Sequence, residues 1–112
     1  MPEFHLRKEL KEKFLRDLNP SEKLFFLKKA REAVLKGYRA SEDLFFFCYY
    51  LTLRERFRNI TAEREEGMLR LLLVEGKKEV EEAVRLYESR LEINKSPSPD
   101  ESGLKFVEFF SE

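Results

Sequence analysis

The residue types that most often carry catalysis or bind metals are nearly absent from this sequence. Its 112 residues include one cysteine, one histidine and no tryptophan. A single cysteine excludes an internal disulfide and a thiolate metal cluster, and it favours a reducing compartment. A single histidine excludes metal sites and acid–base pairs that need two imidazoles. We therefore expect no metal, no cofactor and no catalytic residue.

The two reactive side chains that do occur lie in settings unsuited to chemistry. Cys48 stands between Phe47 and Tyr49, whereas a reactive thiol needs an electropositive, partly open site. His5 falls in the fraying first turn of an expected helix. Gly-rich phosphate loops, nucleophile elbows and metal motifs do not occur. The sequence therefore predicts neither an enzyme nor a small-molecule substrate.

Long apolar runs are missing too. The longest, residues 44–53 (LFFFCYYLTL), is ten residues long, about half of what a membrane span requires. Arg7, Lys8 and Glu9 interrupt any early apolar run, so no signal peptide is expected. We expect no membrane contact and a cytoplasmic location.

Glycine and proline number only four each, and β-branched residues are few, whereas Leu, Glu, Lys and Arg are abundant. This composition is typical of a helical protein of one domain with one core. We predict an all-α fold, a compact bundle of four or five helices with a flexible linker and an apolar C-terminal tail. The dense mixture of Lys, Arg and Glu is thermophile-like.

The apolar run at 44–53 marks the centre of the predicted core. Its flanks are polar, and Ser41 is placed to cap a helix over residues 42–58. A buried strand is the alternative for a short apolar run. Helix is favoured because no Val or Ile accompanies the aromatics and because a lone strand would have no partner. Residues 44–51 then face every direction around the helix axis.

Three further segments have helical periodicity, at 3–18, 20–36 and 62–94. Asn19 and Glu22 form a capping-box pattern around Pro20, and Gly37 is a stop signal. Thr61 is expected to cap the fourth segment, after a short link at 59–61. The apolar arc of the second segment is broad. Its members are Leu24, Phe26, Leu27, Ala30, Ala33, Val34, Leu35 and Tyr38.

The fourth segment permits two interpretations. Either 62–94 is one helix kinked at Gly76, or it is two helices that meet there. The apolar phase changes at this glycine, which favours two helices. Pro97 and Pro99 then mark a linker, so we divide the chain into a helical bundle (1–94), a linker (95–103) and a tail peptide (104–112).

The tail ends in an apolar peptide with the spacing h-x-x-F-F. On one helical turn Phe106, Phe109 and Phe110 project to the same side. Residues 103–110 weakly resemble the peptide by which replication and repair proteins dock on a sliding clamp. The sequence departs from that pattern at Gly103, where the family has Gln, and at Phe106, where it has an aliphatic residue. The resemblance implies partner binding in nucleic-acid transactions.

Two other interpretations of the tail remain open. It can fold back on its own bundle or on a sister subunit, which we favour, or it can add as a strand to a partner's sheet. The first of these would bury Phe106, Phe109 and Phe110 in this chain or its oligomer. Any of the three would hide the apolar side chains from water.

Basic side chains gather in two stretches, 28–39 and 54–64, which makes nucleic acid a candidate partner. Residues 1–40 hold 11 basic and 6 acidic side chains, whereas residues 76–112 hold 6 and 9. Pairing of each arginine with a nearby glutamate is the favoured alternative. The candidate phosphate contacts are Lys28, Lys29, Arg31, Arg54 and Arg58.

Fifteen Phe and Tyr residues are many for a small monomer, so an oligomer or a protein partner is expected. A line at helical spacing, Phe46, Tyr50 and Phe57, is the side of the central helix most open to a second chain. The predicted function is that of a small non-catalytic adaptor or accessory subunit acting through protein–protein contacts. The alternative is a helical nucleic-acid-binding protein.

Overall fold

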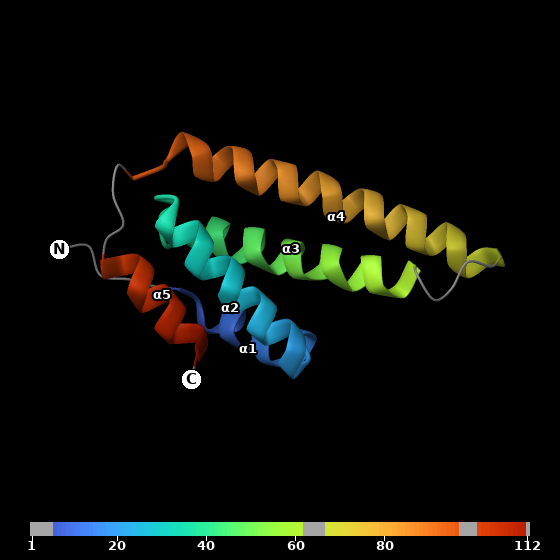
Figure 1. Ribbon diagram of the computed structural model, residues 1–112, viewed down its shortest axis with the longest axis horizontal. Helices are drawn as coiled ribbons and strands as arrows, with labels where there is room; N and C mark the ends of the chain where they lie inside the picture. The colour runs from blue at the N-terminus through green and yellow to red at the C-terminus, as the bar shows by residue number, and fades with distance from the viewer. Residues whose placement is uncertain (1–5, 62–66, 97–100, 112) are drawn as a thin grey trace.

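The apolar run at 44–53 lies in α3 (Glu42–Thr61), around which the other helices pack. In the computed structural model, shown in Figure 1, the described residues are 6–61, 67–96 and 101–111, with side chains described except at 61 and 67–73. Within these residues the fold is an all-α bundle, as predicted. Its other helices are α1 (Lys8–Asp17), α2 (Pro20–Leu35), α4 (Gly67–Ile93) and α5 (Glu101–Ser111).

The two predicted N-terminal caps are confirmed. The Glu22 N–H donates to the Asn19 side chain, and the Glu22 carboxylate accepts from the Asn19 N–H, which completes the capping box of α2. At the start of α3 the Leu44 N–H donates to the Ser41 hydroxyl. Both caps satisfy amides that have no partner within the helix. The two caps therefore fix the residues at which α2 and α3 begin.

Three predicted helix boundaries are wrong. The helix predicted at 3–18 begins only at Lys8, since residues 6 and 7 are not helical. The link predicted at 59–61 belongs to α3, which continues to Thr61, and residues 62–66 lie outside the described part. The two helices favoured for 62–94 are one, because α4 passes through Gly76 without a break. A Cβ at Gly76 would approach the Phe57 ring to within 2.8 Å. The glycine therefore admits the aromatic ring of α3 instead of ending the helix.

The predicted linker and tail also have different limits. α5 begins at Glu101, so the last three residues assigned to the linker are helical. Before it, the Ser96 N–H donates to the Gly37 carbonyl at 2.7 Å, which holds the exit of α4 beside the exit of α2. Residues 97–100, with both prolines, lie outside the described part. Gly103 is buried, and a Cβ there would meet Val34 at 2.4 Å. This glycine lets α5 lie close against α2.

Five phenylalanines from four helices form the centre of the core. Phe26 of α2 packs on Phe14 of α1 and on Phe45 of α3, with ring centroids 4.9 and 5.6 Å apart. Phe110 of α5 contacts all three of these rings. Phe106, which also lies on α5, stacks on Phe26 of α2. This phenylalanine cluster joins α5 to the other helices as an integral part of the bundle.

A second aromatic group joins α3 to α4 on the other side. Phe46 and Tyr50 both stack on Tyr87 of α4, with centroid separations of 5.5 and 6.0 Å. Val80, Val84 and Leu91 continue this buried side of α4. α3 thus has α2 and α5 on one side and α4 on the other, and Figure 1 shows α3 and α4 lying side by side along their length.

Candidate protein-interaction site

The structure changes the role of the tail phenylalanines predicted to bind a partner. Phe106 and Phe110 are 0% and 2% exposed and belong to the phenylalanine cluster, so neither is presented to a partner. Phe109 is half-buried, and its carbonyl accepts a hydrogen bond from the Lys11 ammonium of α1. Within this chain the tail folds back on its own bundle, as in the alternative that we favoured. The apolar match of α5 to α1, α2 and α3 is the physical reason.

The second predicted partner-binding line is also occupied within the chain. Phe46 and Tyr50 lie against Tyr87, and Phe57 lies against Gly76. Helix α4 therefore covers the side of α3 that was predicted to be most open to a second chain. All three aromatic residues are half-buried rather than exposed. The line is therefore an interface between α3 and α4 of one chain.

Three of the five candidate phosphate contacts are paired with carboxylates. Arg54 lies 3.6 Å from Glu81, and Arg58 lies 3.4 Å from Glu55. Lys29 lies 3.4 Å from Glu32, whereas Lys28 and Arg31 are exposed and form no ion pair within the described residues. Arg64 lies outside those residues. The stretch at 54–64 therefore offers less free positive charge than its composition suggests.

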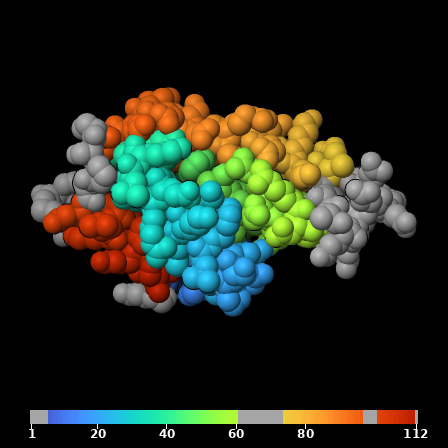
Figure 2. All heavy atoms as spheres, viewed as in Figure 1, coloured from blue at the N-terminus to red at the C-terminus, as the bar shows by residue number. Residues whose placement is uncertain are grey.

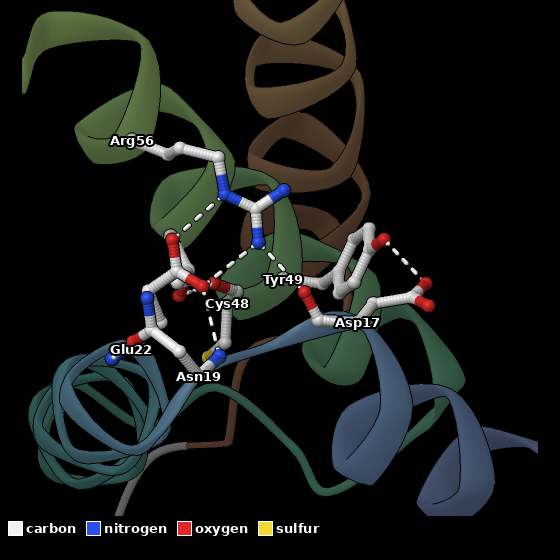
Figure 3. A network of polar contacts seen from close by, with 7 residues as sticks. Asp17, Asn19, Glu22, Cys48, Tyr49 and Arg56 are labelled. Atoms are coloured by element: carbon white, nitrogen blue, oxygen red, sulfur yellow. Dashed lines mark hydrogen bonds and ion pairs between the residues drawn. The ribbon is translucent and has the colours of Figure 1, made fainter. Parts of the chain in front are cut away.

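Arg56 is at the centre of the main polar network, drawn in Figure 3. Its guanidinium donates to both oxygens of Glu22, at 2.7 and 2.8 Å, and to the Asp17 carbonyl at 2.7 Å. The Asp17 carboxylate accepts from the Tyr49 hydroxyl at 2.9 Å and from Lys13 at 3.0 Å. A bidentate guanidinium–carboxylate pair fixes orientation as well as distance. The network therefore ties the α1–α2 corner to α3 and is structural.

These contacts shift the pKa of both carboxyls. Burial acts to raise the pKa of Asp17, but hydrogen bonds from Lys13, Arg16 and Tyr49 outweigh it and lower that pKa to about 2. The hydrogen bonds from Arg56 likewise hold the pKa of Glu22 below its usual value. A carboxyl with a lowered pKa stabilises the fold above its unfolded pKa and loses that contribution as the pH falls through the folded one.

We expect the urea midpoint of the protein to fall as the pH drops from about 4, near the unfolded Asp pKa, to 2. In the Asp17→Asn variant this pH dependence should be weaker, because the amide does not titrate. Circular dichroism at a series of pH values measures both. Glu12→Gln on the exposed side of α1 is the matched control, and a fall of equal size in both variants would contradict the assignment.

The surface with the clearest interaction character is the outer side of α2, which the sequence analysis missed. Leu24 and Leu35, predicted to be buried, are 68% and 74% exposed, which corrects that assignment. Lys28 and Arg31 lie between them, and at 3.6 residues per turn the four positions share an arc of about 60°. We call these four residues the α2 stripe. In Figure 2, α2 lies on the face toward the viewer.

The spacing of these residues was the available signal. Residues 24, 28, 31 and 35 follow the 4-3-4 step of a helix that packs lengthwise on another helix. The broad apolar arc assigned to this segment hid that pattern, because Leu24 and Leu35 were counted together with the residues that face the core. The residues of α2 that face the core are Phe26, Leu27, Ala30, Ala33 and Val34.

The cysteine and one surface hollow are two further features of the described residues. Cys48 is completely buried, and that burial raises the pKa of its thiol, which favours the unreactive protonated form. A hollow of about 480 Å³ lies at the connection between α2 and α3, beside the C-terminal end of α4. Arg39, Arg90 and Lys95 line it, but Arg90 pairs with Asp43 and Lys95 with Glu92. Among the described residues, no group of three or more metal-ligating side chains is placed to hold an ion.

Comparison with protein families, with curated proteins and with solved structures finds no match for this chain. In the described part of the chain, no helix is both long enough and apolar enough to cross a membrane.

Proposed function

We propose that this protein is a small non-catalytic adaptor or accessory subunit of the cytoplasm, which acts by docking a partner protein on the α2 stripe. The exposure of Leu24 and Leu35 on either side of Lys28 and Arg31 carries the proposal. Single exposed leucines are common on protein surfaces. Two of them aligned on one helix with two unpaired cations between them form a surface that gains from being covered.

The chemistry of the α2 stripe selects the kind of partner. An amphipathic helix with acidic side chains at its centre would bury both leucines and pair with Lys28 and Arg31. Helices recognise one another through such anchors at i, i+3, i+4 and i+7 spacing. Complementary charge sets the orientation and speeds the encounter, while burial of the leucines slows dissociation.

The nucleic-acid alternative has weaker support. Arg54 and Arg58 pair with glutamates, and the Arg56 guanidinium is held by Glu22 and a carbonyl. Of the five candidate phosphate contacts, Lys28 and Arg31 form no ion pair within the described residues, and two cations give little of the phosphate affinity that such binding needs. Docking on a sliding clamp would require α5 to leave the bundle, because Phe106 and Phe110 are buried there.

A paired-variant capture experiment tests the proposal. Tagged wild-type protein, Leu24→Ser/Leu35→Ser and Leu15→Ser/Leu104→Ser are used to purify partners from nuclease-treated lysate of the source organism. Leu15 and Leu104 are also exposed, at 48% and 63%, but lie on α1 and α5. We expect the wild type and the control to retain one partner that the α2 variant loses, with equal melting temperatures for all three.

Retention of the same proteins by all three chains would contradict the role of the α2 stripe, as would the absence of any partner, a second copy of this chain included. Loss of the partner on nuclease treatment alone would support the nucleic-acid alternative instead. Loss after removal of residues 104–112 from a chain that still folds would support clamp-type docking by the tail.

A further inference from the structure

The outer side of α4 carries a second stripe, of opposite charge. Val80, Val84 and Leu91 are buried toward α3, and the residues on the other side of the helix are exposed. At 3.6 residues per turn, five of them share an arc of about 60°. We call these residues the α4 stripe: Glu75, Glu79, Glu82, Leu86 and Ile93.

The two stripes match in spacing, and three of their four aligned positions match in chemistry; the fourth places Leu24 opposite Glu75. The α2 stripe steps from Leu24 to Leu35 in intervals of four, three and four residues, and the α4 stripe steps from Glu75 to Leu86 in the same intervals. Side by side, the central cations of one helix face the central carboxylates of the other. Lys28 then lies opposite Glu79, Arg31 opposite Glu82, and Leu35 opposite Leu86.

The flanking residues favour the parallel orientation of these two helices. Glu32 borders the α2 stripe and Lys78 borders the α4 stripe, in positions equivalent to e and g of a coiled coil. In parallel helices an e residue faces a g residue of the partner's preceding heptad. Glu32 and Lys78 then face each other as a third pair of opposite charges, in which Glu32 shares its carboxylate with Lys29 of its own chain.

The carboxylates of the α4 stripe are available for this contact. Glu79 and Glu82 form no ion pair within the described residues and are exposed. Their neighbour Glu81, by contrast, is engaged by Arg54 of the same chain. Lys28 and Arg31 are similarly unpaired, so complementary charges are left over on two different helices.

The two stripes cannot meet within one chain. Both α2 and α4 pack against α3, and each stripe lies on the side of its helix away from the buried residues. Figures 1 and 2 show α2 on the near face of the bundle and α4 along its upper edge. The complementary surfaces therefore belong to different copies.

We propose that a second copy of this chain is a partner of the α2 stripe, bound through its α4 stripe; this rests on the proposed function of the α2 stripe as a docking surface. The contact joins two different surfaces, so it closes a dimer only if it forms twice. Otherwise it propagates into a ring or an open chain. One helix pair buries little area, and the assembly should be weak and sensitive to salt.

Charge-swapped variants test this inference by sedimentation velocity at low salt over a wide range of protein concentration. Wild type should associate as the concentration rises. Lys28→Glu/Arg31→Glu and Glu79→Lys/Glu82→Lys should each associate about tenfold or more weakly, because like charges then face each other. A mixture of these two variants should associate again, since each supplies the charges that the other has lost.

Lys8→Glu/Lys105→Glu is the matched control, because it changes the net charge as much as the first variant but lies on α1 and α5. It should associate like the wild type. If the control associates as weakly as the first variant, the loss of association is caused by net charge and not by the α2 stripe. A wild type that stays monomeric, or a mixture that does not associate, would overturn the inference. Circular dichroism confirms that each variant is folded.

The outcomes also separate this inference from the proposed function. A chain that remains monomeric but captures a partner through Leu24 and Leu35 would refute self-association and leave the docking function intact. A chain that neither self-associates nor captures a partner would refute both. Self-association with charge-swap rescue, and no other partner, would support both.

Discussion

Replacing Phe106 or Phe110 by alanine is expected to lower the free energy of unfolding by about 3–5 kcal/mol. Each substitution removes a buried ring from the phenylalanine cluster and leaves a cavity between α5 and the other helices. Phe110 touches Phe14, Phe26 and Phe45, so its loss also removes ring contacts to three helices. Domains of this size are typically stable by only about 5–15 kcal/mol, so each variant should be severely weakened.

Urea denaturation followed by circular dichroism measures this effect. Leu104→Ala is the matched control, because Leu104 lies on the same helix but is 63% exposed. The control should change the free energy of unfolding by less than about 0.5 kcal/mol. Equal stability of all three proteins would mean that α5 is not packed on the bundle in solution, and the tail would again be a candidate docking peptide.

Gly37→Ala is expected to cost about 2–4 kcal/mol, the second large effect. Gly37 has φ of 95°, and a side chain in left-handed backbone costs about 1–2 kcal/mol. A Cβ at this position would also lie 2.4 Å from the Ser96 carbonyl oxygen. That oxygen is backbone and cannot rotate away, and such overpacking adds about 1–3 kcal/mol. The Ser96–Gly37 hydrogen bond would be strained as well.

Gly37→Asn separates the two causes of this destabilisation. Asparagine tolerates positive φ better than alanine, but it brings the same Cβ toward Ser96. If contact with Ser96 dominates, thermal melts should show both variants similarly destabilised. If backbone conformation dominates, the asparagine variant should recover most of the loss. A wild-type melting temperature in both would contradict the close approach of α2 and α4 at this point.

Local signals in the sequence predicted the parts of the fold that local interactions determine. The capping box at Asn19 and Glu22 and the cap at Ser41 act within one helical turn, so three or four adjacent letters are enough to recognise them. The apolar run at 44–53 predicted the central helix because its residues face every direction around a helix axis. The all-α class followed from composition and periodicity.

What the sequence could not predict depends on contacts between distant segments. Gly76 was interpreted as a helix break. A glycine is needed there because the Phe57 ring of α3 lies too close for a Cβ, and this contact is not visible in the sequence. Leu24 and Leu35 were assigned to the same apolar arc as the core residues, because the sequence does not show which part of a broad arc its neighbours cover. The tail was ambiguous because three phenylalanines suit a partner as well as they suit the groove between α1, α2 and α3. Only the arrangement of helices separates these cases.

The same ambiguity limited the prediction of the site. The sequence contains basic residues at 28 and 31 and acidic residues at 79 and 82. Whether these charges are exposed on the outer sides of their helices depends on how α2 and α4 are rotated about their own axes as they pack against α3. Arg54, Arg56 and Arg58 looked alike, and only the fold reveals that each has a glutamate within reach.

The position of α5 in the core has a consequence for how the protein is made. Phe14 and Phe110 touch although 96 residues separate them in the chain, and α5 is synthesised after every helix that it covers. During translation Phe14, Phe26 and Phe45 therefore lack the helix that shields them, whether or not α1 to α4 have assembled. The nascent chain exposes an aromatic surface until α5 emerges from the ribosome, so it should depend on chaperones during that interval more than the finished protein does.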